Sequence, residues 1–347
     1  MNRLLDDIVH KELSLMRKEN LFLQHGLMGY AIFCFWYGRM SQDDKYTKIA
    51  ERCLMHVCKS VNNKCSLGIS DGLSGIGIGI CYLCSKNYLE GDPNRLLQGI
   101  DDYMFKVIEK GLQQERIENE AYIDSLLDVM LYLNFRLRTD IRKPYEKQIL
   151  ELFFEKILNW SYQNAGYSFF EEPLPSNLSY RLAKFLFILG HVCELNFYNS
   201  RIKRIIKELE IVILSRIPYS GFNRLFLYCA LRKLASQIKL GKRWNSYIEI
   251  LKSSISIEQI LSLEMKSYNM FFFDGLGGVY LLLKYCNKNE LAFDISEEYF
   301  ISKLKASETW QMLTNSFEYK PLGLDGFLGL IMAFEKINIW QYDDEKS

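Results

Sequence analysis

Four polar residues stand beside glycine pairs that open apolar segments, and their types are those of acid–base chemistry. His25, Asp71 and Asp274 each come directly before a glycine, and Asp325 lies inside a fourth glycine pair. Carboxylates that converge with a histidine on one concavity can transfer protons or hold a ligand. The aspartates have a second interpretation as helix N-caps, and His25 has one as a buried, hydrogen-bonded side chain. We therefore treat all four as candidate catalytic residues, with both interpretations open.

A second group of polar residues is expected to line the same opening. Glu171 and Glu172 follow aromatic residues in a long loop. This combination can bind a peptide or a sugar, or the segment can simply be a solvated loop. Arg224 can hold a carboxylate or a phosphate, or neutralise nearby aspartates. The candidate ligand-binding residues are Glu171, Glu172, Asn177, Asn223, Arg224 and Tyr319.

The glycine pairs share the motif Gly-Leu-x-Gly, whose regular recurrence predicts a repeat architecture. The first glycines of the four motifs are Gly26, Gly72, Gly275 and Gly323. Their spacing fits a repeat of roughly fifty residues, with degenerate copies near Ile123, Asn177 and Gly221. Each copy begins with an apolar segment, which predicts a helix buried on most sides, and continues with an amphipathic segment.

Buried helices that alternate with half-buried ones predict an all-α fold of two concentric layers. We expect an α/α toroid, a double ring of about seven inner and seven outer helices, in a single domain over residues 1–347. The segment Arg3–Met16 is expected to supply the outer helix that the last copy lacks. Among helix starts, Ser41 is a candidate N-cap and Asp92-Pro93 opens a further helix. Strands are not expected, because sustained alternation and hairpin dipeptides are missing.

Composition narrows the class of protein. Lys and Arg number 43 against 42 Asp and Glu, which argues against a nucleic-acid footprint. No apolar stretch approaches the roughly 18 residues of a membrane span, and the N-terminus lacks the apolar core of a signal peptide. We therefore expect a cytoplasmic protein whose nine cysteines are all thiols, with no cofactor and no metal.

Two cysteine groups are considered as sites. Cys81 and Cys84 share a helix face, and packing explains them better than redox or metal chemistry does. A second group of cysteine and histidine side chains lies on the first amphipathic helix and in the loop after it. Zinc binding would require all four ligands on one side, and we leave this possibility open. The members of this group are Cys53, His56, Cys58 and Cys65.

The repeat resembles the lanthionine synthetase C-like (LanC-like) family, through the motifs at His25-Gly26, Asp71-Gly72 and Asp274-Gly275 and the motif at Gly323. The resemblance implies an α/α toroid with its site at the mouth where the inner helices begin. Cyclases of this family bind zinc there and add a peptide cysteine thiolate to a dehydroamino acid. Their ligand positions correspond here to Phe273, Pro321 and Leu322, none of which can bind a metal.

The sequence therefore predicts a zinc-free LanC-like protein associated with peptide modification. We expect a recognition or scaffold role, with a precursor peptide or a peptide-modifying enzyme as partner and at most non-zinc chemistry. The alternative is an α/α-toroid hydrolase or lyase that acts on a glycan or similar substrate through carboxylates at the mouth. A purely structural ring is a third possibility. Whether the chain is an enzyme is left open by the sequence.

Overall fold

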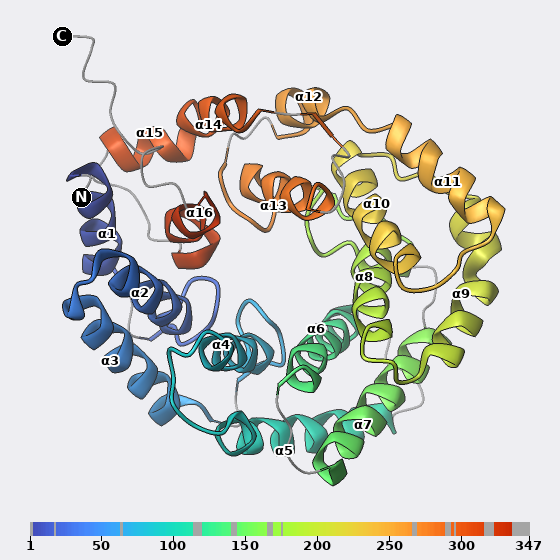
Figure 1. Ribbon diagram of the computed structural model, residues 1–347, viewed down its shortest axis with the longest axis horizontal. Helices are drawn as coiled ribbons and strands as arrows, with labels where there is room; N and C mark the ends of the chain where they lie inside the picture. Colours follow the sequence, from blue (N-terminus) through green and yellow to red (C-terminus); the bar gives the residue numbers. More distant parts are fainter. Residues whose placement is uncertain are drawn as a thin grey trace. The chain divides into compact units, whose positions relative to one another are not determined.

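In the described part of the chain the regular secondary structure is helical, apart from an isolated β-bridge between Ser66 and Gly72. The computed structural model describes residues 3–16, 19–62, 65–113, 120–139, 144–164, 169–174, 176–265, 269–288, 293–294, 296–315 and 323–334. These ranges form sixteen α-helices with short 3-10 and π-helical turns and no β-strand (Figure 1). The all-α prediction is confirmed. None of the helices in these ranges has both the length and the apolarity needed to cross a bilayer.

The chain divides into two compact units, each built from segments that are separate in sequence. Unit 1 comprises Met1–Gly91, Ser267–Gly277 and Ile295–Ser347, and unit 2 comprises Asp92–Lys266 and Gly278–Asp294. The helices of unit 1 are α1 (Arg3–Ser14), α2 (Leu27–Ser41), α3 (Asp44–Ser60), α4 (Leu73–Ser85), α14 (Glu297–Lys305), α15 (Glu308–Asn315) and α16 (Phe327–Phe334). Helix α13 (Leu276–Cys286) begins in unit 1 and lies in unit 2 from Gly278 onward.

Unit 1 pairs an apolar helix with an amphipathic one. Nearly every side chain of α2 is buried, and α3 lies along it with Tyr46, Cys53 and Val57 buried on one face (Figure 1). Helix α1 packs against α16, so the N-terminal segment supplies a partner to the last copy as expected. Buried Glu12 of α1 accepts a hydrogen bond from Tyr30 Oη of α2 at 3.0 Å. Two layers of helices therefore form around the first copy.

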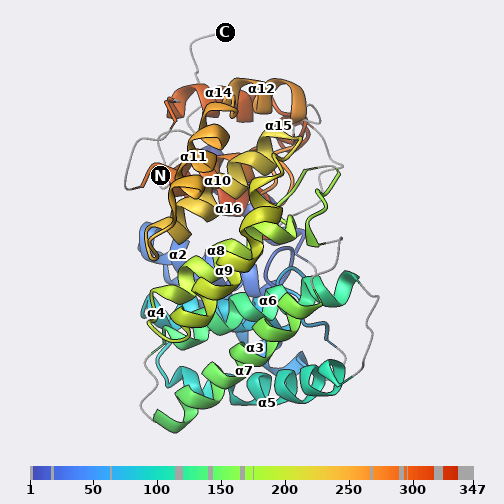
Figure 2. The same ribbon diagram turned by 90° about the vertical axis from the view of Figure 1, so that its right-hand side faces the viewer.

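Unit 2 contains the remaining helices: α5 (Pro93–Leu112), α6 (Glu120–Leu137), α7 (Pro144–Gln163), α8 (Arg181–Cys193), α9 (Asn199–Leu214), α10 (Gly221–Ala235), α11 (Lys242–Ser253) and α12 (Ile257–Gln259), followed by a π-helical turn (Ile260–Glu264). The apolar helices α6, α8 and α10 pack one against the next, and each contacts an amphipathic helix: α7, α9 and α11, respectively. Figure 2 shows α5 and α7 lying side by side. Arg181 of α8 pairs with Asp124 of α6 at 2.8 Å.

Helix starts agree with the sequence in one case and differ in another. Asp92 is the N-cap of α5 with Pro93 in its first turn, as predicted. The prediction for Ser41 is wrong, because this residue ends α2 and its hydroxyl donates to the Tyr37 carbonyl at 2.7 Å. Asp43 caps α3 instead, where its carboxylate accepts the amide of Lys45.

Candidate functional site

Three loops that lead into apolar helices share one hydrogen-bond pattern, and all three belong to unit 1. In the first loop, the Asn20 carbonyl accepts the Leu27 amide at 2.8 Å, while Asn20 Oδ1 accepts the Phe22 amide at 3.1 Å. Ser66 and Asn269 make the equivalent pair of bonds in the loops before α4 and α13. A short polar side chain six residues before each glycine thus closes the loop onto the start of the helix.

This closure explains the first glycine of each motif. A Cβ atom on Gly72 would lie 2.5 Å from both the Gly68 nitrogen and the Ser66 carbonyl oxygen. Only glycine allows so close an approach, and Gly72 itself is the N-cap of α4 with no side-chain bond. The N-cap interpretation is therefore wrong for Asp71. This exposed residue accepts a hydrogen bond from Ser66 Oγ at 3.2 Å within its own loop.

Asp325 is the residue that joins the other loops of unit 1. Its side chain is 6% exposed, and its Oδ1 atom accepts the amides of Phe272 and Phe273 at 2.9 and 3.0 Å. Its Oδ2 atom lies 3.7 Å from Nε2 of His25. Burial raises the pKa of this carboxyl, and the charge of Asp274 acts in the same direction, whereas His25 and the two amides oppose the rise.

The fourth motif lies directly against the first loop. Gly323 has φ of +55°, a conformation that favours glycine. The Gln24 carbonyl accepts the Leu324 amide at 2.8 Å. Three loops, 20–26, 269–275 and 323–326, therefore meet at Asp325. The structure brings His25, Asp274 and Asp325 together and leaves Asp71 bonded within a separate loop.

This cluster can hold or move a proton. His25 is half-exposed beside a buried carboxylate, an arrangement in which the carboxylate orients the imidazole. Within the described ranges, no group of three or more His, Cys, Asp or Glu side chains is placed to hold a metal ion. The Cys53 group does not converge either: Cys53 is buried and contacts Met16, whereas His56 and Cys58 are exposed. Pro321, Leu322 and Tyr319 lie outside the described residues.

A second cluster, in unit 2, holds two of the predicted ligand-binding residues. Glu172 Oε1 accepts the Tyr219 amide at 2.6 Å, and Oε2 accepts the Ser220 amide at 3.3 Å and Nδ2 of Asn223 at 3.0 Å. The start of α10 is further capped by Glu264, which accepts the next two amides of the chain. Glu172 and Asn223 thus fasten the loop 169–174 to the loop 216–220.

Other predicted residues of unit 2 also bond to backbone. The Arg224 guanidinium donates to the carbonyls of Pro218, Tyr219 and Ser254 at 2.6 to 2.9 Å. Asn177 Oδ1 accepts the Ser179 amide at 2.8 Å and so closes a turn before α8. Glu171, in contrast, is exposed.

The loops 169–174 and 216–220 carry exposed apolar side chains that the sequence analysis did not identify. Leu174 is 81% exposed, Tyr219 85% and Ile217 50%. Phe169, one of the aromatic residues that precede Glu171 and Glu172, is instead buried, with its ring centroid 5.1 Å from that of Phe185. A usable signal was the position of Leu174 and Tyr219, each directly after a proline in a loop.

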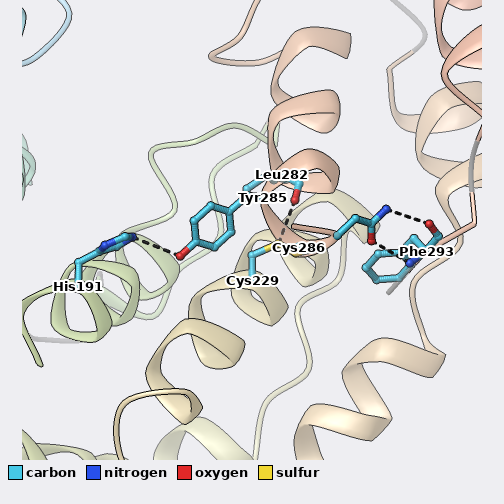
Figure 3. Close-up of a disulfide and its surroundings, with 7 residues drawn as sticks. His191, Cys229, Leu282, Tyr285, Cys286 and Phe293 are labelled. Carbon is cyan, nitrogen blue, oxygen red and sulfur yellow. Dashed lines mark hydrogen bonds between the residues drawn. A yellow bond between two sulfur atoms is a disulfide. The ribbon is translucent and has the colours of Figure 1, made fainter. Parts of the chain in front are cut away.

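The prediction that all nine cysteines are thiols is wrong for two of them. Cys229 of α10 and Cys286 of α13, both in unit 2, form a disulfide with their Cα atoms 5.7 Å apart (Figure 3). The two residues occupy apolar helix faces, as Cys34, Cys81 and Cys193 do, and only the packing of α13 beside α10 pairs them. Cys81 and Cys84 remain thiols.

Alternating apolar and amphipathic helices, three of the apolar ones entered through a closed loop, define an all-α repeat protein. The family model of lanthionine synthetase C-like proteins matches residues 18–177, which include the first two Gly-Leu-x-Gly motifs, His25 and Asp71. The resemblance to this family is confirmed over that stretch. The fold class of the family is the α/α toroid. The match also supports a relation to peptide modification. A search of curated proteins found no match.

Proposed function

We propose that this chain is a LanC-like protein of peptide modification that binds an extended peptide and does so without zinc. The peptide is a modification precursor or a segment of a modifying enzyme. The observation that carries this proposal is the pair of loops 169–174 and 216–220, which expose Leu174, Ile217 and Tyr219 on a backbone fixed by Glu172. Exposed apolar anchors on a preorganised surface favour binding because little freedom is lost on association.

The zinc-free part of the proposal rests on the ligand positions of the family. Phe273 stands at one of them, and its amide donates to Asp325. An aromatic ring supplies no donor to a metal ion. Metal analysis of the purified chain is expected to find less than stoichiometric zinc, and a tightly bound equivalent would overturn this part.

Proton transfer, if the protein performs any, is assigned to His25 beside Asp325. The glycan-hydrolase alternative has less support. Both carboxylate oxygens of Asp325 already face partners, namely two backbone amides and His25. A general acid must instead present its proton to the glycosidic oxygen.

Peptide binding is tested with a displayed library of random peptides selected on the wild-type chain. Affinities of the enriched peptides are then measured by fluorescence anisotropy. Tyr219→Ala and Leu174→Ala are each expected to weaken binding by about tenfold, the loss typical of an interface anchor. Ile211→Ala is the matched control, because Ile211 is 78% exposed on α9. Peptides that bind all three variants as tightly as wild type would refute the proposed surface.

A further inference from the structure

Unit 2 also contains a cavity at the C-terminal ends of its apolar helices. A cavity of about 790 Å³ is lined by the C-terminal parts of α6, α8, α10 and α13. Its walls include both cysteines of the disulfide, Cys229 and Cys286. The loops 169–174 and 216–220 precede the N-terminal ends of α8 and α10, so this cavity is distinct from the peptide-binding surface proposed above.

The charged groups of the cavity are mostly cationic. Four basic side chains line it, Arg138, Arg232, Lys233 and Lys288, against the single carboxylate of Glu194. Arg138 donates to Glu194 at 2.6 Å, and Lys233 donates to the other carboxylate oxygen. One carboxylate therefore faces two cations, which leaves the cavity with an excess of positive charge.

The remaining titratable groups do not offset this excess. Burial lowers the pKa of His191 to about 4, with Lys233 acting in the same direction, so its imidazole is neutral near pH 7. Burial also raises the pKa of Tyr285 to about 12, and its hydroxyl lies 3.2 Å from Nε2 of His191. Figure 3 shows this pair beside the disulfide. Neutral polar side chains thus form the wall next to Cys286, and the cations determine the potential of the cavity.

The two cysteines of the disulfide differ in burial. Both line the cavity, but Cys229 is fully buried, whereas Cys286 is half-buried. A nucleophile that enters the cavity reaches Cys286 Sγ. Thiolates are the nucleophiles that open disulfides, and a positive potential concentrates those that also carry a negative group.

We propose that the Cys229–Cys286 disulfide and this cationic cavity form a thiol–disulfide exchange site for small thiols that bear a carboxylate. The thiolate of the first molecule attacks Cys286 Sγ, the Cys229–Cys286 bond breaks, and Cys229 leaves as a thiolate that takes a proton from water. A second thiolate attacks the small molecule's sulfur in the mixed disulfide and releases the Cys286 thiolate. In sum, two small thiols are oxidised to their disulfide, and the protein disulfide is reduced to two thiols.

The test compares mercaptopropionate with cysteamine, which differ mainly in the sign of the charge beside the thiol. Each opens the disulfide of the full chain, followed by mass spectrometry, and each reacts in parallel with hydroxyethyl disulfide to correct for intrinsic reactivity. The corrected rate ratio is expected to favour mercaptopropionate by about tenfold or more and to shrink at high salt. A ratio of one or less overturns the proposal.

Variants locate the effect. Arg232→Met and Lys233→Met are expected to lower the corrected ratio toward one. Arg243→Met is the control, because this arginine is exposed on α11 and does not line the cavity. Trapped intermediates should carry the small thiol on Cys286, and an adduct on Cys229 would refute the assigned point of attack. The wild-type ratio and its salt dependence decide the matter without any variant that fails to fold.

Discussion

Replacing Glu172 by alanine is expected to release the loop 216–220 from the loop 169–174, whereas the same change at Glu171 is expected to do almost nothing. The two residues are adjacent and chemically identical. Glu172 accepts three hydrogen bonds, from the amides of Tyr219 and Ser220 and from Nδ2 of Asn223. Glu171 is exposed.

The size of the effect follows from these contacts. A hydrogen bond to a charged acceptor contributes about 1.5 to 3 kcal/mol net. The bond from Tyr219 is exposed, so water replaces it at little cost, whereas the bonds from Ser220 and Asn223 are partly buried. Two partly buried bonds near the low end of that range give a loss of about 2 to 4 kcal/mol for Glu172→Ala. Glu171→Ala should change stability by less than about 0.5 kcal/mol.

Amide hydrogen exchange under native conditions measures this loss locally. The expected loss corresponds to roughly 30- to 900-fold faster exchange at the Ser220 amide. Glu172→Gln keeps one acceptor oxygen and should recover about half of the lost free energy. If Glu171→Ala and Glu172→Ala accelerate exchange equally, the fastening of the two loops by Glu172 is wrong.

Two further predictions concern unit 1 and the glycines. Burial raises the pKa of Asp325 above its unfolded value of about 4. The stability of wild type relative to Asp325→Asn should therefore fall as pH rises from 4 to 7. Denaturation at both pH values measures this difference, and a relative stability that rises with pH would contradict the prediction. A Cβ on Gly75 would lie 1.9 Å from the Ile69 carbonyl oxygen, whereas Gly99 in α5 has no atom within 4 Å of its Cβ position. Calorimetry should therefore find Gly75→Ala destabilised by about 1 to 3 kcal/mol or more. Gly99→Ala should be stabilised by about 0.5 to 1 kcal/mol. Equal changes in stability for the two variants would refute the close packing at Gly75.

Much of the fold can be predicted from the sequence because the motifs that indicate it are local. Each Gly-Leu-x-Gly motif requires a close approach of backbone at the start of an apolar helix, and the structure has such an approach at Gly26, Gly72 and Gly275. The motifs also placed His25 and Asp325 at one end of their helices, and the two side chains lie 3.7 Å apart. The single-domain prediction and the catalytic roles stay predictions.

Other features depend on partners that are distant in sequence. No local pattern around Glu264 indicates that its carboxylate caps α10 through Gly221 and Phe222. The disulfide was missed for a similar reason. Cys229 and Cys286 occupy apolar helix positions that resemble those of the thiols Cys34, Cys81 and Cys193, and only the packed helices bring them within bonding distance.

The bond between the Gln24 carbonyl and the Leu324 amide has a consequence for biosynthesis. The residues of α2 are translated well before the segment that completes the loop in front of them, because residues 323–326 come much later in the sequence. Helices α6, α8 and α10 come from one continuous stretch and can assemble while translation proceeds. Unit 1 must therefore keep the apolar surface of α2 protected until residues 323–326 have been translated, and its long-range contacts should make it the slower unit to fold.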